Sequence, residues 1–164
     1  MKKLILLLIF NIFIGCNTSA QQAKKTENQS KTKEYKIEKT RSEWKEALTP
    51  MQYYVLREAG TERPWTSEFN TLKKEGTFVC AGCDTPLYES KNKFNSGTGW
   101  PSFDKAIKGN VEFDVDYKIG YARTELKCNT CGGHLGHKFN DGPRETTGER
   151  HCINGVALKF IPIN

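Results

Sequence analysis

Two C-x-x-C pairs constrain this chain more than any other feature of its sequence. Cys80-Ala-Gly-Cys83 and Cys128-Asn-Thr-Cys131 are separated by residues 84–127, a longer spacer than small zinc ribbons use. Four thiolates on two such turns suit a tetrahedral zinc ion, and a zinc ion with four protein ligands is structural. A redox pair or two disulfides are the alternative uses of these residues. We therefore predict a structural zinc site with four cysteine ligands that joins two distant turns.

The chain after residue 60 is predicted to be mainly β. Residues 111–117 alternate apolar and acidic side chains, which indicates a strand with one face in water. Residues 77–80, 119–126 and 152–161 are also rich in β-forming residues and are bounded by turn-forming ones. No long helical pattern separates these segments, which argues against parallel βαβ units. We expect antiparallel sheets.

Two short helices are predicted before the sheets. Thr40 and Thr49 are each followed three residues later by Glu or Gln, the pattern of a capping box. Pro50 falls at a first helical position, where its missing N–H costs nothing. We predict helices over residues 42–48 and 50–58.

The N-terminus is predicted to be a targeting segment. Two lysines precede an apolar stretch over residues 4–14, which is too short to span a bilayer as a helix. The stretch ends in Phe13-Ile14-Gly15-Cys16, which resembles a bacterial lipoprotein cleavage box. We expect residues 1–16 to be a signal peptide and Cys16 to be lipidated, so that the protein is exported and anchored on the periplasmic or extracytoplasmic side. Plain cleavage without lipidation is the alternative.

The rest of the chain divides by composition into two parts. Residues 17–40 are polar and are predicted to be a flexible tether, and residues 41–164 fit one domain. The net charge is +6, yet residues 41–164 carry 17 Lys+Arg against 16 Asp+Glu. A nucleic-acid-binding domain carries its excess positive charge on the folded part. We therefore predict no nucleic-acid partner, and we expect a monomer.

Cys152 is a candidate nucleophile because no pairing or metal site accounts for it. Arg150 and His151 precede it, and positive neighbours lower the pKa of a thiol. The alternative is a buried cysteine used as a small apolar side chain. His134 and His137 are candidate proton donors, since four cysteines already satisfy the zinc ion. A metal pair or polar turn residues are the alternatives for these histidines.

Trp100 is a candidate binding residue because it stands in a glycine-rich loop. Glycines at 97 and 99 allow sharp turns, and such a loop can present an aromatic ring at the surface. The default alternative is a tryptophan buried in the core.

Four motifs accompany the cysteine pairs, in a set order and spacing. They are Gly60-Thr-Glu-Arg-Pro64, Gly99-Trp-Pro-Ser-Phe103, His134-Leu-Gly-His137 and Arg150-His-Cys-Ile-Asn154. With these motifs the chain resembles the methionine-R-sulfoxide reductases of B type over about residues 41–162. The resemblance implies two antiparallel sheets in a β-tent, with one zinc ion held by Cys80, Cys83, Cys128 and Cys131.

The resemblance also implies a peptide-methionine (R)-S-oxide reductase that repairs oxidised proteins. Cys152 would attack the sulfoxide sulfur, which releases methionine and leaves a sulfenic acid on the enzyme. Both histidines would donate protons, and Asn154 and Asp141 would orient the imidazoles. The implied catalytic residues are Cys152, His137, His134, Asn154 and Asp141, and the implied substrate-binding residues are Trp100, Phe139 and Arg150.

Three residues depart from the pattern of this family. Thr98 stands where many relatives have a resolving cysteine, His151 stands where an aromatic residue is usual, and Gly155 replaces a common serine. Without a free internal thiol, the sulfenic acid requires an external reductant. We expect a thioredoxin-like protein, with a small-molecule thiol as the second choice.

Two other classes of function use the same residues. A zinc-ribbon-like binding module would use the four-cysteine site to support a partner surface, but the nearly neutral domain and Cys152 with its histidines disfavour it. A Cys–His hydrolase would use Cys152 and His137, but nothing in the sequence indicates an oxyanion hole.

Overall fold

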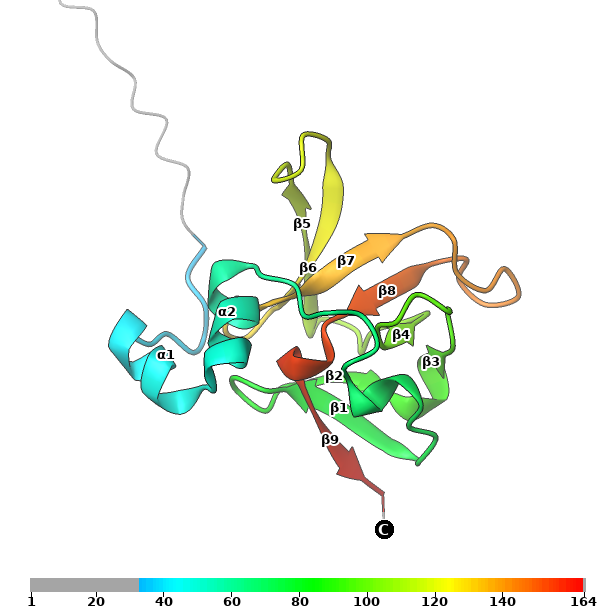
Figure 1. The fold of residues 1–164 in the computed structure, drawn as a ribbon, viewed down its shortest axis with the longest axis horizontal. Helices are drawn as coiled ribbons and strands as arrows, with labels where there is room; N and C mark the ends of the chain where they lie inside the picture. Colours follow the sequence, from blue (N-terminus) through cyan, green and yellow to red (C-terminus); the bar gives the residue numbers. More distant parts are fainter. Residues whose placement is uncertain (1–32, 164) are drawn as a thin grey trace, which may run out of the picture. The chain divides into compact units, whose positions relative to one another are not determined.

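The computed structural model describes residues 33–163, which form two short helices and two antiparallel sheets (Figure 1). The predicted mainly β fold with short N-terminal helices is confirmed. The predicted signal peptide over residues 1–16 lies outside the described residues, as do residues 17–32 of the predicted tether. Within residues 33–163, no helix has the length and apolar character needed to cross a membrane.

The second helix has the predicted bounds, and the first begins and ends one residue earlier than predicted. α1 spans Arg41–Ala47 and α2 spans Pro50–Glu58. The side chains of Thr40 and Thr49 accept hydrogen bonds from the third helical N–H at 3.3 Å, and the capping box is complete in each case. Trp44 of α1 is buried in the core with two side chains of α2.

One sheet has three strands in the order β2-β1-β9. Its strands are β1 (Gly76–Cys80), β2 (Pro86–Glu89) and β9 (Leu158–Pro162). The other sheet has six strands in the order β3-β4-β8-β7-β6-β5. Its strands are β3 (Lys93–Phe94), β4 (Ser102–Phe103), β5 (Val111–Asp116), β6 (Arg123–Cys128), β7 (His134–Phe139) and β8 (Arg150–Ile153). Short 3₁₀ turns are η1 (Glu68–Asn70), η2 (Ser90–Asn92) and η3 (Gly155–Ala157).

Aromatic packing joins the two sheets. Phe103 of β4 stacks on Tyr88 of β2 with ring centroids 4.3 Å apart, and it meets the edge of Phe78 of β1 at 5.0 Å. All three rings are fully buried. The six-stranded sheet, which carries the candidate nucleophile, therefore has a rigid support on one side.

Two predicted strands differ from the observed ones. Residues 152–161 do not form one strand, because the turn η3 breaks them into the end of β8 and most of β9, in different sheets. Residues 119–126 are strand only from Arg123 onward, since the preceding residues form the tip of the β5–β6 hairpin.

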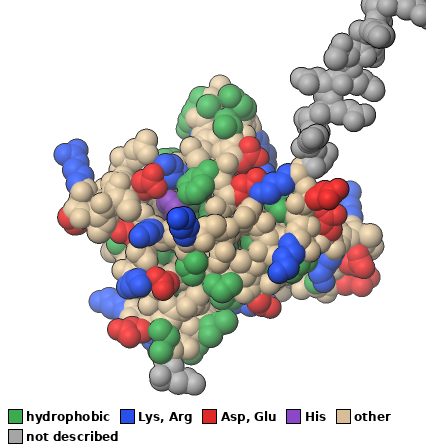
Figure 2. All heavy atoms as spheres, turned by 180° about the vertical axis from the view of Figure 1, so that it is seen from behind, with side chains coloured by type: hydrophobic (Ala, Val, Ile, Leu, Met, Phe, Trp, Pro, Cys, Tyr) green, Lys and Arg blue, Asp and Glu red, His purple; other side chains and the backbone are tan. Residues whose placement is uncertain are grey.

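The β5 strand turns its apolar face to the core side, where Val111 is buried and the Phe113 ring lies 5.7 Å from the ring of the buried His151. Phe113 and Val115 are still 51% and 55% exposed, whereas Asp116 on the other face is half-buried. Further apolar side chains are exposed at the hairpin tip, where Figure 2 shows hydrophobic side chains gathered. The acidic face of β5 is therefore the one directed toward the functional site.

The folded part begins before residue 41, which corrects the predicted boundary of the tether. The Tyr35 hydroxyl donates a hydrogen bond to a carboxylate oxygen of Glu112 at 3.0 Å, and the backbone N–H of Ile37 donates one to Thr130 O at 3.0 Å. Gly132, with φ +70°, lies so close to the Tyr35 ring that a Cβ there would come within 2.4 Å of it. Residues 33–40 are thus packed on the domain by the few large side chains of a polar segment.

Candidate functional site

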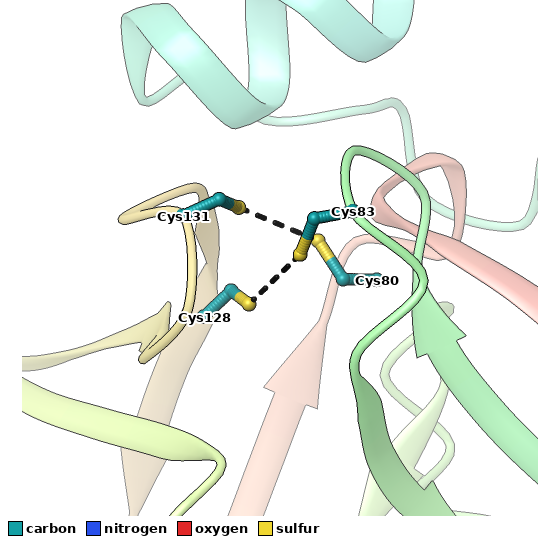
Figure 3. Close-up of side chains that lie close together, drawn as sticks. All are labelled: Cys80, Cys83, Cys128 and Cys131. Atoms are coloured by element: carbon teal, nitrogen blue, oxygen red, sulfur yellow. Dashed lines mark hydrogen bonds between the residues drawn. The ribbon is translucent and has the colours of Figure 1, made fainter. Parts of the chain in front are cut away.

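The side chains of the four cysteines in the C-x-x-C pairs form one cluster (Figure 3). The first pair lies at the turn between β1 and β2, and the second lies between β6 and β7. All four sulfur atoms lie within 4.8 Å of one another, with Cys80–Cys131 at 3.8 Å and Cys83–Cys128 at 3.5 Å. Tetrahedral zinc with Zn–S bonds of about 2.3 Å separates its sulfur ligands by about 3.8 Å. The cluster therefore has the donors and spacing to hold a metal ion, and all four thiols are free rather than disulfide-bonded.

Local backbone geometry builds this cluster. Asp84 N donates to Cys80 O at 2.9 Å and Gly132 N donates to Cys128 O at 2.8 Å, which closes a tight turn after each pair. From α2, Arg57 donates to Cys131 O at 2.9 Å. The helix thereby fastens the second turn from outside.

Cys152 lies in the middle of the six-stranded sheet. On β8 it is paired with Ser102 of β4 on one side and with His137 of β7 on the other. Residues directly opposite each other in an antiparallel pair share a face, so Cys152 and His137 point to the same side. A cavity of about 150 Å³ opens there.

Most of the predicted site residues line this cavity. Those that do are Trp100, His137, Phe139, Cys152 and Asn154. Thr61, Arg123 and Gly136 also line it, although no signal in the sequence selected them. Gly136 is required there, because a Cβ at this position would lie 2.0 Å from Cys152 O.

The two histidines are oriented by carboxylates that sequence reasoning missed. His137 Nε2 is 2.8 Å from Asp116 Oδ2, and the buried His134 places Nδ1 2.6 Å from Glu125 Oε1. The rings lie 5.3 Å apart, centroid to centroid. Burial lowers the pKa of His137, and the hydrogen bond that its ring makes to the Asp116 carboxylate opposes that shift. The acidic face of β5 therefore supplies the counter-charge for a protonated His137.

Asn154 and Asp141 do not orient the imidazoles, which corrects that expectation. Asp141 forms a two-pronged ion pair with Arg150, at 2.8 and 2.9 Å. The Asn154 side chain accepts from Glu62 N and donates to Leu135 O, both at 2.9 Å. Both residues lie just beyond strand ends and their side chains have other partners, so Asp141 fixes an arginine and Asn154 fixes the backbone of the cavity wall.

The surroundings of Cys152 differ from those expected. Burial raises the pKa of the Cys152 thiol above its ordinary value, although the charge of Arg150 and a hydrogen bond from Thr98 both lower it. His151 adds no charge there, because alternation on β8 turns it to the opposite face, where its Nδ1 lies 3.2 Å from Tyr88 Oη. Burial also lowers the pKa of His151.

Glu62 is a further residue that sequence reasoning missed. It is only 3% exposed, and its carboxylate accepts from the backbone N–H groups of Gly155 and Val156. Its carbonyl accepts from Trp100 Nε1 at 3.2 Å. Glu62 could have been selected from the sequence because it lies inside the Gly60–Pro64 motif. Gly155 itself leaves room for Ser67, whose Oγ would lie 1.9 Å from a Cβ at that position.

The cavity has the parts of a thiol-dependent enzyme site: a thiol, an imidazole with its carboxylate, and an aromatic wall. The SelR domain family model matches residues 48–162. The peptide methionine sulfoxide reductase MsrB of Leifsonia xyli subsp. xyli is 48% identical over 130 residues, covering 79% of this chain and 94% of that protein. The chain therefore belongs to the SelR domain family.

Two further relatives carry the same name. The MsrB of Burkholderia lata is 49% identical over 132 residues, 80% of this chain and 92% of that protein. The MsrB of Chromohalobacter salexigens is 46% identical over 128 residues, 77% of this chain and 96% of that protein. The crystal structure of the Mis18 'Yippee-like' domain aligns with a TM-score of 0.45 and 15% identity over 56% of this chain and 99% of that one, which is too distant to bear on function.

Proposed function

We propose that this protein reduces methionine-R-sulfoxide residues of oxidised proteins to methionine, with Cys152 as the nucleophile. Family membership supports the reductase activity, which is the activity named for the relatives. The observation that carries the assignment of the site is the pairing of Cys152 with His137 inside a cavity walled by Trp100. Neither a binding module nor a hydrolase accounts for this combination as directly.

The chemistry follows from these groups. The Cys152 sulfur attacks the sulfoxide sulfur, and the oxygen that gains charge takes a proton from His137. The net step converts a thiol and a sulfoxide into a sulfenic acid and a thioether, so the enzyme sulfur is oxidised as the methionine is reduced. Trp100 offers an aromatic face to the S-methyl group, a contact that favours sulfur by about 0.3–1.5 kcal/mol.

The test of this function uses both epimers of a blocked methionine sulfoxide, with dithiothreitol as the reductant. We expect the R epimer to be consumed and the S epimer to remain, as resolved by chiral chromatography. Consumption of neither epimer would overturn the assignment, whereas consumption of the S epimer alone would overturn the stereochemistry.

We further propose that the sulfenic acid on Cys152 is reduced directly by a thioredoxin-like protein, with water as the second product. The other four described cysteines lie in the metal cluster, and the residues that hydrogen-bond Cys152 are Thr98 and Arg150, neither of which is a thiol. One equivalent of R-sulfoxide without reductant, followed by dimedone, should label Cys152 alone. An internal disulfide in the peptide map would contradict this route.

For the metal cluster we propose a structural zinc ion. Four thiolates select zinc over magnesium or calcium, and a site with four protein ligands has no open position for substrate. Its contribution would be to fasten the β1–β2 turn to the β6–β7 turn. Metal analysis of the purified protein should find one zinc per chain.

The proposed location is outside the cytoplasm, as a monomeric lipoprotein anchored through Cys16. The sequence of residues 1–16 supports this proposal. Radiolabelled palmitate should label the wild-type chain and fail to label Cys16→Ser, and sedimentation of the mature domain should give a single-chain mass.

A further inference from the structure

A second cavity, of about 700 Å³, adjoins the catalytic one. Residues 70–77 line one side of it, and residues 89–95 with the Gly99–Trp100 segment line the other. Trp100 lines both cavities. Volumes of 300–1,000 Å³ are typical of ligand-binding sites, whereas the catalytic cavity is smaller than that range. The two spaces therefore suit different parts of one extended ligand that passes Trp100.

Trp65 stands at the rim of the larger cavity in an unusual conformation. Its side chain is 66% exposed, and its φ of +66° is a left-handed conformation that bulky residues rarely adopt. A hydrogen bond from Trp65 N to Gly99 O at 2.7 Å holds it there. Its ring lies against Gly99, where a Cβ would come within 2.9 Å of Trp65 Nε1. An exposed aromatic side chain is thus held beside Trp100 at a cost in backbone strain.

The larger cavity also carries an excess of positive charge. Lys73, Lys74 and Lys93 line it and form no ion pair within residues 33–163. The other lysine of the lining, Lys91, is paired with Glu89 at 2.8 Å, which leaves Glu75 as the only unpaired described carboxylate of the lining. Charges in a concave site attract a ligand of opposite sign.

We propose that this cavity, lined by Lys73, Lys74, Lys93 and Trp65, binds the polypeptide segment that flanks the oxidised methionine and favours acidic side chains in that segment. The proposal rests on the proposed function of the Cys152 cavity. The cavity at Cys152 measures only about 150 Å³, so the rest of a protein substrate would lie on the adjoining surface. Trp65 would pack against that chain, and the lysines would pair with its carboxylates.

The test compares three R-sulfoxide substrates with dithiothreitol as the only reductant. They are a blocked single methionine sulfoxide, a peptide with two aspartates on each side of it, and the same peptide with lysines in place of the aspartates. We expect kcat/KM for the acidic peptide to exceed that for the basic one. Lys73→Gln/Lys74→Gln should reduce the ratio of kcat/KM for the acidic peptide over the blocked residue by about threefold to fivefold, the size expected for two exposed ion pairs.

The control is Lys105→Gln/Lys108→Gln, which removes two exposed lysines outside the cavity and should leave that ratio unchanged. High salt should lower the ratio in the wild type toward that of the Lys73/Lys74 variant. Equal kcat/KM for the two peptides, or an equal fall in the control, would overturn the proposal. Inactivity toward all three substrates would instead contradict the proposed function itself.

Discussion

Glu62 joins the loop before the sheets to the turn that follows Cys152, so its substitution tests how the site is held together. Its carboxylate accepts from Gly155 N and from Val156 N, the second at 3.0 Å. Its backbone contacts two cavity residues, with N donating to Asn154 Oδ1 and the carbonyl accepting from Trp100 Nε1. Loss of the side chain should therefore loosen the η3 turn and, through it, the cavity wall.

The magnitude follows from the two donors that Glu62→Ala leaves without an acceptor. Each buried unpaired donor costs about 1–3 kcal/mol, but Val156 is only half-buried and water can reach its N–H. Burial raises the pKa of the Glu62 carboxyl, although both N–H groups lower it, so the folded state disfavours the charge. Removing the charge offsets part of the loss. We expect the unfolding free energy at pH 7 to fall by about 2–3 kcal/mol.

Glu62→Gln is the matched variant, because a neutral amide resembles the protonated carboxyl that burial favours. It retains one acceptor, so we expect a loss below about 1.5 kcal/mol. A raised folded-state pKa means that the contribution of Glu62 is fully present below the unfolded pKa and is lost as pH rises through the folded value. The penalty of Glu62→Gln should therefore be larger at pH 4 than at pH 7.

Urea unfolding followed by tryptophan fluorescence measures these differences, with metal content determined on the same samples. Glu68→Ala is the control, since Glu68 is exposed and its side chain forms no hydrogen bond among residues 33–163. The alanine variant should also lose kcat/KM, because the turn after Cys152 is no longer held. If Glu62→Ala costs no more than Glu62→Gln, or less than about 1 kcal/mol, the reasoning is refuted.

Other substitutions test the remaining parts of the site. Cys152→Ser should abolish sulfoxide reduction and keep the metal, and measurable turnover would contradict its role. Cys83→Ser should lose metal and unfolding free energy together, because metal binding in such sites is folding energy; metal analysis with urea unfolding checks this. Thr98→Cys should yield an internal disulfide with Cys152 after one turnover, seen in a peptide map, because Thr98 hydrogen-bonds that sulfur. The pH midpoint of iodoacetamide alkylation at Cys152 should lie above the ordinary thiol value, and Arg150→Met should raise it further; a lower midpoint in the variant would refute this.

Local signals predicted the parts of the fold that depend on local contacts. The capping boxes at Thr40 and Thr49 determine where both helices begin, because the cap and its partner are three residues apart. The cysteine pairs predicted which turns meet, since each pair is built by its own backbone hydrogen bonds. The chain from 152 to 161 was predicted as one strand because its β-forming residues outweigh the turn-forming pair Asn154-Gly155. The break at η3 falls at that pair, and Glu62, which is distant in sequence, accepts hydrogen bonds from the turn.

The orientation of the histidines depends on a choice that alternation alone cannot make. A period of two assigns the residues of β5 to two faces without saying which face the sheet turns inward. The apolar face is turned to the core side, where Val111 is buried and Phe113 contacts His151. The acidic face therefore brings Asp116 to His137. The approach of Asp116 to His137 follows from the strand register. β5 is an edge strand, and its only neighbour in the sheet, β6, pairs on its other side with β7, which carries both histidines. Burial lowers the pKa of His137 and Asp116 opposes that shift, so the acidic residues of β5 act on the chemistry of the site while its apolar residues pack on the core side.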